Sequence, residues 1–247
     1  MKWRLLLELG GGYGIDDSGG GLAGTVFVSP VAANLAAVGM LVVTPQHAGR
    51  GLGRRLMCHA LEVAADSTVF LYATAAGLPL YTRLGFRTVT EVVSHTGPYR
   101  GSSAAAQSSD VRRARASDLS GIAELDTRAF GADRSHVLRR MFDFAEKVVI
   151  APGNGYAAGW RNLGNFQVGP LVAEDPSVAT ILLEALLRDI DGRVRIDLHS
   201  AAPALVQDWV VDRGLREQPP APLMVFRQAA LPGERSVVLT PFMQALG

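Results

Sequence analysis

The sequence predicts an α/β protein (α+β, with a mixed sheet) that consists of two copies of one domain in tandem. Strand-like and helix-like patterns of apolar residues alternate along the chain. A small, polar stretch, residues 101–110, separates two such series and is typical of a linker. The run Val-Gly-Met-Leu-Val-Val at Val38 returns as Val-Gly-Pro-Leu-Val-Ala at Val168. Self-similarity at a period of about 130 residues indicates duplication. We therefore predict domains at residues 1–100 and 111–247.

The composition excludes several classes of protein. The chain has 247 residues and a formal net charge of +1, which gives no field to hold a nucleic acid. Cys58 is the only cysteine, so neither an internal disulfide nor a cysteine-cage metal site is expected. No apolar run reaches the ~18 residues that a membrane span needs, and no signal peptide is recognisable. We expect a cytoplasmic protein without bound metal.

The first half alternates short elements, each bounded by turn residues. A helical pattern over residues 3–9 stops at three glycines, and two strands follow around the turn Asp17-Ser18-Gly19-Gly20. A continuously apolar strand comes next, as expected for the middle of a sheet. The predicted strands are 13–16, 22–28, 36–43, 68–74 and 86–94, and the later helices are 54–65 and 78–84, the last ending at Gly85. The second half opens with a strand at 111–115 and a helix at 118–130.

A glycine-rich loop between the apolar strand and the next helix is the sharpest signal for function. Gly49, Gly51 and Gly53 alternate at a helix N-terminus, where backbone N–H groups and the helix dipole favour an anion such as a pyrophosphate. A Walker loop would end in Gly-Lys-Ser/Thr, and the dinucleotide fingerprint would read G-x-G-x-x-G with a later acid. Neither pattern is present.

The loop and a second segment resemble the GNAT superfamily of acetyl-CoA-dependent acyltransferases. The superfamily pattern V-x-P-x-x-R-G-x-G-I/L-G-x-x-L is matched in register by Val43, Pro45, Gly49, Gly51, Leu52, Gly53 and Leu56. The run Leu-Tyr-Thr-Arg-Leu-Gly-Phe from Leu80 is similar to the second signature, L-Y-x-x-L-G-F. Residues from Val111 resemble the first strand and helix of the same fold, so the likeness covers most of the chain as a tandem pair.

The resemblance implies roles for particular residues. Backbone groups of Met40, Leu41 and Val43 would bind the pantetheine arm and thioester, with an N–H at Met40 or Leu41 as oxyanion hole. The loop of Gly49, Arg50, Gly51, Leu52, Gly53 and Arg54 would hold the pyrophosphate, and Arg50, Arg54 or Arg55 would reach the 3′-phosphate. Tyr81 would be the general acid that protonates the departing thiolate. The general base is not identified, and Glu91, His95 and His47 are the nearby candidates.

The implied activity is N-acetylation of a primary amine of a small molecule or peptide by acetyl-CoA. Ala48, the missing initial elements of the first copy and the unidentified general base favour an alternative, an acyl-CoA-binding sensor or scaffold without turnover. Ala48 stands where Arg or Gln is usual, and Tyr72 and Ala75 replace the acid and proline of related tandem proteins. The first copy also lacks the usual initial strand and helix, so the second copy or a homodimer is expected to cover the gap. A third reading is a structural protein with an empty loop.

The second copy is predicted to bind no cofactor. Residues 176–183 replace the glycine loop without any glycine, and Val210 replaces Tyr81. One further expectation places the tail, residues 241–247, with its terminal carboxylate at the acceptor site.

Overall fold

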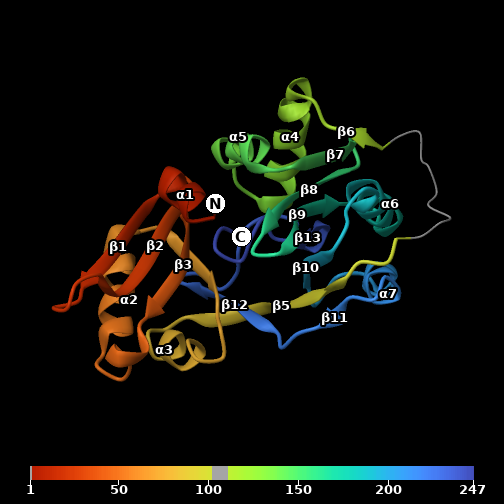
Figure 1. The fold of residues 1–247 in the computed structure, drawn as a ribbon. Coiled ribbons are helices and arrows are strands. Elements are labelled where there is room, and N and C mark those ends of the chain that lie inside the picture. The colour runs from red at the N-terminus through yellow and green to blue at the C-terminus, as the bar shows by residue number, and fades with distance from the viewer. Residues whose placement is uncertain (1, 102–110) are drawn as a thin grey trace. The chain divides into compact units, whose positions relative to one another are not determined.

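The computed structural model describes residues 2–101 and 111–247 (Figure 1). Most of the predicted linker therefore lies outside the described residues. The chain divides into two compact units. The first unit comprises Met1–Val89, Pro222–Ala230 and Gln244–Gly247, and the second comprises Thr90–Ala221 and Leu231–Met243.

The first unit is a sheet of strands in the order β1-β2-β3-β4-β12. All neighbours are antiparallel except β3 and β4, which are parallel. Its elements are α1 (Lys2–Leu9), β1 (Gly11–Asp16), β2 (Leu22–Ala32), β3 (Leu35–Val43), the 3-10 helix η1 (Pro45–His47), α2 (Leu52–Val63), β4 (Thr68–Tyr72), α3 (Leu78–Arg83) and β12 (Ala221–Phe226).

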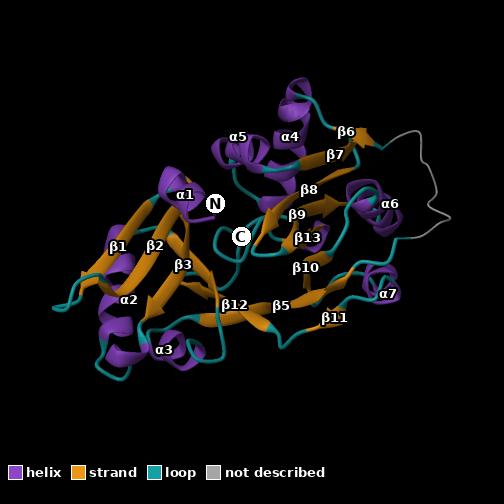
Figure 2. Ribbon diagram, viewed as in Figure 1, coloured by secondary structure: helices purple, strands orange, loops and turns teal. Residues whose placement is uncertain are grey.

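Helices cover both faces of this sheet (Figure 2). Leu56, Met57 and Ala60 of α2 are buried against Val26, Val28 and Val38 on one face. On the other face, Trp3 of α1 packs edge-on against Phe27, with ring centroids 5.2 Å apart. Side chains alternate along β2, so Phe27 points away from the α2 side of the sheet. The apolar stripe of α2 explains its docking, because each large side chain that it buries contributes about 1.5–3 kcal/mol.

The second unit contains the remaining strands of the 13-stranded sheet and their helices. Its strand order is β5-β10-β9-β8-β7-β6, with β11 beside β5 and β13 beside β9. Its elements are β5 (Arg87–Pro98), β6 (Arg112–Arg113), the 3-10 helix η2 (Ala116–Asp118), α4 (Leu119–Phe130), α5 (Ser135–Phe144), β7 (Lys147–Ala151), β8 (Gly155–Asn162), β9 (Asn165–Ala173), α6 (Pro176–Leu187), β10 (Arg193–His199), α7 (Ala204–Asp212), β11 (Arg216–Glu217), the 3-10 helix η3 (Arg235–Val237) and β13 (Val238–Thr240).

Two strands, β5 and β12, each pair with a strand from the other half of the sequence. The predicted closing strand of the first half forms as β5, but its residues from Val92 to Pro98 pair with β10 of the second unit. In turn β12, from the end of the second half, pairs with β4 from Phe226↔Val69 to Leu223↔Tyr72. The strands of each unit thus include one from the other half of the sequence.

Candidate active site in the first unit

The sheet of the first unit opens between β3 and β4. The parallel ladder holds only at Leu35↔Thr68, Ala36↔Val69 and Ala37↔Phe70. Beyond Ala37, β3 continues to Val43 with β2 on one edge, and no described strand pairs with the other edge. Its backbone N–H and C=O groups on that edge can therefore bind an extended ligand, as the edge of a sheet does. We call residues 38–43 the open half of β3.

A β-bulge changes the direction of the backbone in the open half of β3. Phe27 pairs with Gly39 and Thr25 with Val42, so Met40 and Leu41 together oppose a single residue of β2. Met40 has a φ of 51°, which is uncommon for a side chain other than glycine, and its carbonyl accepts a hydrogen bond from Thr25 Oγ1 at 3.2 Å. Met40, Leu41 and Val43 are all partly buried here, where the sequence places the thioester and pantetheine contacts.

The glycine loop leaves a run of backbone donors without partners. Gly49 and Gly51 both have a φ of 76°, and Gly51 caps α2 without a side-chain hydrogen bond. None of the amides of residues 49–54 donates to another described residue, and Arg55 N is the first that does, to Gly51 O at 3.0 Å. A Cβ added at Gly49 or Gly51 would meet no atom within 4 Å. The loop thus presents free N–H groups to open space at the positive end of a helix dipole.

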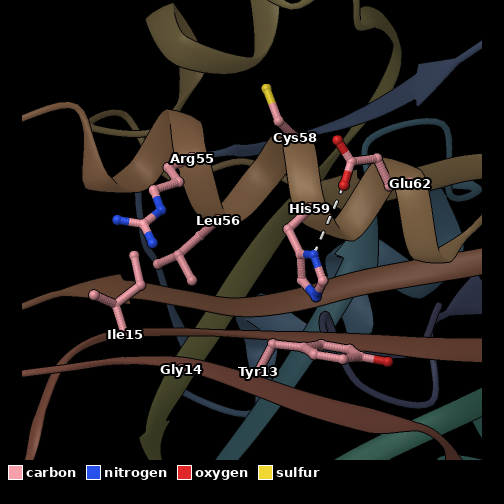
Figure 3. Close-up of a pocket in the computed structure, with 8 residues that line it drawn as sticks. All are labelled: Tyr13, Gly14, Ile15, Arg55, Leu56, Cys58, His59 and Glu62. Atoms are coloured by element: carbon pink, nitrogen blue, oxygen red, sulfur yellow. Dashed lines mark ion pairs between the residues drawn. The ribbon is translucent and has the colours of Figure 1, made fainter.

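The arginines beside the loop differ in direction. Arg50, Arg54 and Arg55 are exposed and form no ion pair with a described residue. Arg55 lines a separate cavity of about 440 Å³ between β1 and α2, where its guanidinium lies beside Ile15 (Figure 3). Tyr13, His59 and Glu62 occupy the other end of that cavity. Arg50 and Arg54 therefore remain the better candidates for a 3′-phosphate.

Tyr81 lies on α3 in the same unit as the loop. Gly53, at the start of α2, is in contact distance of Leu80, because a Cβ there would lie 3.5 Å from Leu80 Cδ2. The Tyr81 ring is 7% exposed and packs against Phe86 with centroids 5.9 Å apart. Its hydroxyl makes no hydrogen bond to another described residue. Burial raises the pKa of the phenol, so it keeps its proton at neutral pH.

The three candidates for a general base differ in their surroundings. His47 follows the open half of β3, but Thr44 Oγ1 lies 2.9 Å from its Nδ1 and Asp17 Oδ1 lies 3.4 Å from its Nε2. Glu91 and His95 belong to the second unit. His95 is 3% exposed, with Val93 O at 3.1 Å from Nδ1 and Glu217 Oε1 at 3.6 Å from Nε2. His47 and His95 thus have polar partners, whereas the carboxylate of Glu91 has no ion pair or hydrogen bond with a described residue.

Comparison with models of known protein families identifies the family of this chain. Two models, each described as an acetyltransferase (GNAT) domain, match residues 11–88 and 122–239. The chain belongs to the GNAT acetyltransferase family. The two matched segments confirm the predicted tandem of GNAT domains, and the mixed α/β fold is also confirmed.

Relatives of this GNAT protein support the same assignment. An uncharacterized N-acetyltransferase, YitH of Bacillus subtilis, is 25% identical over all of this chain and 89% of its own length. A mycothiol acetyltransferase of Tsukamurella paurometabola is 41% identical, but over 33% of this chain and 31% of its own. A solved putative acetyltransferase from Pyrococcus horikoshii superposes with a TM-score of 0.79 at 18% identity, covering 100% of this chain and 84% of that one. A tandem GNAT protein from the clavulanic acid biosynthesis pathway gives 0.60 at 17%, covering 85% and 80%.

In the second GNAT domain, α6 begins where the glycine loop would lie. Asp175 caps this helix, and its carboxylate accepts a hydrogen bond from Ser177 N at 2.7 Å. A negative charge thus already occupies the helix end that corresponds to the glycine loop of the first domain. Val210 is fully buried at the position that matches Tyr81.

The chain itself fills the opening between the central strands of the second domain. β9 pairs with β10 only as far as Val168↔Ile196, and then with β13 at Leu171↔Thr240 and Val172↔Val238. Because β8 takes the other edge of β9, β13 must lie on the edge that β10 leaves. Sequence reasoning missed this insertion, because no local pattern marks which strand residues 238–240 pair with.

We therefore expect one acetyl-CoA per chain. Isothermal titration calorimetry should give a stoichiometry near one, since β13 and Asp175 close the second domain to an extended thiol carrier. A stoichiometry near two would contradict this reading of the second domain.

Asp175→Ala should lower the stability of the second unit without creating a cofactor site. Loss of a helix cap costs about 1 kcal/mol, and β13 still blocks the opening. Chemical denaturation measures the first effect and calorimetry the second. Asp208→Ala, which removes an exposed side chain of α7 that forms no ion pair with a described residue, serves as the control and should change the free energy of unfolding by less than about 0.5 kcal/mol.

Two features are absent from the described residues, 2–101 and 111–247. None of the helices in this part of the chain is long and apolar enough to cross a membrane. Across the same residues, His, Cys, Asp and Glu side chains form no group of three or more suited to hold a metal ion.

Proposed function

We propose that the protein is an N-acetyltransferase that moves an acetyl group from acetyl-CoA to a primary amine of a small molecule or peptide. One observation carries the proposal: the unpartnered amides of residues 49–54 stand beside the open half of β3, in the same unit as the buried phenol of Tyr81. We also propose the cytoplasm as its location.

The residues of the first domain fit a CoA thioester in shape and charge. Amides of residues 49–54, with Arg50 and Arg54, would hold the phosphates through charge-assisted hydrogen bonds. Backbone groups of Met40, Leu41 and Val43 would pair with the pantetheine amides, as an added strand does. Open space at Gly49 and Gly51 leaves room for the backbone to approach a diphosphate. When bound, acetyl-CoA supplies an acyl carbon activated by its sulfur.

The proposed reaction forms a C–N bond and breaks the C–S bond of the thioester. An N–H of Met40 or Leu41 would stabilise the charge that develops on the thioester oxygen. Tyr81 would donate its proton to the departing sulfur, and burial suits it to this role because it keeps the phenol protonated. The amine would release its proton to water, since β3 carries no ionisable side chain and His47 is held by Thr44 and Asp17.

That missing base also supports a second candidate, an acyl-CoA-binding sensor or scaffold without turnover. Ala48 removes a side chain that the family usually offers to the phosphates. The loop amides serve binding equally well in both candidates. The two candidate functions differ only in whether an amine reacts with the bound acetyl-CoA.

Two measurements separate the candidates. Millimolar acetyl-CoA should raise the melting temperature of the protein, because a ligand that binds only the folded state stabilises it. Thiol release with a panel of primary amines should then exceed the rate without amine. Thermal protection without amine-dependent thiol release would favour the sensor, and no protection at all would overturn both candidates in favour of a structural protein.

A further inference from the structure

The last four residues of the chain pack onto the open half of β3. Gln244–Gly247 belongs to the first unit, although the residues before it belong to the second. A Cβ built on Gly39 would lie 2.8 Å from Ala245 Cβ and 3.0 Å from Ala245 Cα. Ala245 is 8% exposed and Leu246 is fully buried. The chain end is therefore a packed part of the fold at this strand.

This contact lies on the face of the sheet opposite to α2. Val38 belongs to the core beneath α2, and side chains alternate along β3, so a side chain at Gly39 would point to the other face. Its partner across the ladder, Phe27, packs against Trp3 on that same face. The loop that would hold the phosphates begins the helix on the first face. A second substrate that reaches the open half of β3 from the other face therefore meets the tail.

The matching glycine of the second domain is also covered by the tail. Gly169 follows Val168 as Gly39 follows Val38, and a Cβ on it would lie 2.6 Å from Phe242 O. One continuous segment thus covers both glycines, residues 241–242 at Gly169 and Ala245 at Gly39. In the second domain, β13 of the same segment pairs with β9 and closes the opening, whereas in the first domain no described strand pairs with that edge of β3.

We propose that Gln244–Gly247, which we call the terminal wall, bounds the acceptor side of the open half of β3 and limits the size of the amine that can reach the thioester. This inference rests on the proposed acetyltransferase function. The wall acts by position: Ala245 packs on Gly39, the residue before Met40 of the bulge, and the fully buried side chain of Leu246 holds the segment in place. A compact aliphatic amine fits such a boundary better than an aromatic one.

Truncation after Met243 tests the size limit. Acetyl-CoA should still bind, because the loop and α2, which would hold the phosphates, are untouched. The ratio of kcat/KM for phenethylamine over methylamine should rise about tenfold, equivalent to about 1.4 kcal/mol, as the acceptor side opens. Ala245→Gly, which keeps the wall and removes only the methyl that faces Gly39, should move the ratio in the same direction by a smaller factor. An unchanged ratio in both variants would overturn the proposal.

Hydrogen exchange gives a readout that does not depend on turnover. Amides of residues 38–43 should exchange faster in the truncated chain than in the full chain, while amides of β7 and β8 keep their rates and report that the second unit is folded. Equal exchange of residues 38–43 in both chains would show that the tail does not cover the strand, and would overturn the proposal. Failure of the proposed function looks different: the full chain would release no thiol with any amine, whatever the exchange rates.

Discussion

Gly51→Ala is expected to weaken acetyl-CoA binding about 100-fold while leaving the protein folded. The new Cβ would project into the open space of the loop, where it meets no protein atom, so the clash is with the diphosphate. Displacing the ligand from one or two charge-assisted hydrogen bonds costs about 1.5–3 kcal/mol each, and 1.4 kcal/mol is a factor of ten in affinity. Calorimetry with acetyl-CoA measures the loss.

Gly153→Ala is the matched control for this substitution. Gly153 lies between β7 and β8 with a φ of 80° and, like Gly51, has no atom within 4 Å of an added Cβ. Both substitutions carry the same backbone strain, about 1–2 kcal/mol for a left-handed residue with a side chain. Both variants should lose the same free energy of unfolding, and only Gly51→Ala should lose affinity for acetyl-CoA. That result would show that the lost affinity comes from a clash of the new methyl group with the ligand. Unaltered affinity in Gly51→Ala would remove the loop from the cofactor site.

Local patterns in the sequence were sufficient for most elements of the first unit. The continuously apolar run predicted at 36–43 is β3, Leu35–Val43, and the predicted helix stop at Gly85 has a φ of 94°. The helix predicted at 54–65 begins earlier, at Leu52, because Gly51 itself is the N-cap. Capping by a glycine gives no side-chain signal, so the pattern of apolar residues was the only guide to this boundary.

The partners of strands were beyond local patterns. Residues 221–226 are continuously apolar, as a buried strand can be, yet they pair with β4, about 150 residues earlier in the chain. Pairing is decided by which edges remain free after the rest of the sheet forms, and side-chain periodicity carries no information about that. For the same reason the sequence could not place β13 in the opening of the second domain or Ala245 on Gly39.

The same limit applies to the residues of the candidate site. Gly49, Gly51, Met40 and Tyr81 could be named because two family signatures fix their positions in the chain. For the acceptor side the sequence offered only the expectation for the tail, residues 241–247, because no family signature covers that side. The capping carboxylate of Asp175 was also missed, although an aspartate directly before Pro176 is a recognisable helix start.

Tyr81→Phe is expected to lower the rate of amine-dependent thiol release about 100-fold with acetyl-CoA affinity nearly unchanged. General acid catalysis contributes about 10²–10⁴-fold, and the ring itself, which packs against Phe86, is kept. Burial raises the pKa of Tyr81 above its ordinary value of 10.0. The wild-type rate should therefore fall with loss of the phenol proton only at a pH above that value, and this limb should be absent from the variant. Tyr13→Phe, on the far side of α2 in the cavity with Arg55, is the control and should keep the wild-type rate.

Gly77→Ala tests the position of the same phenol without removing it. A Cβ at Gly77 would lie 2.7 Å from Tyr81 Cε2 and 3.1 Å from its hydroxyl oxygen, while the φ of −83° suits alanine. The ring must therefore move, which displaces the hydroxyl group. The rate should drop about tenfold, because misplacement of a catalytic group by about 1 Å costs up to about 100-fold. Gly121→Ala, inside α4 with no atom near its added Cβ, should leave the rate as it is. If Tyr81→Phe and Gly77→Ala both turn over at the wild-type rate, the thiolate leaves without help from this side chain, and Tyr81 is a core residue.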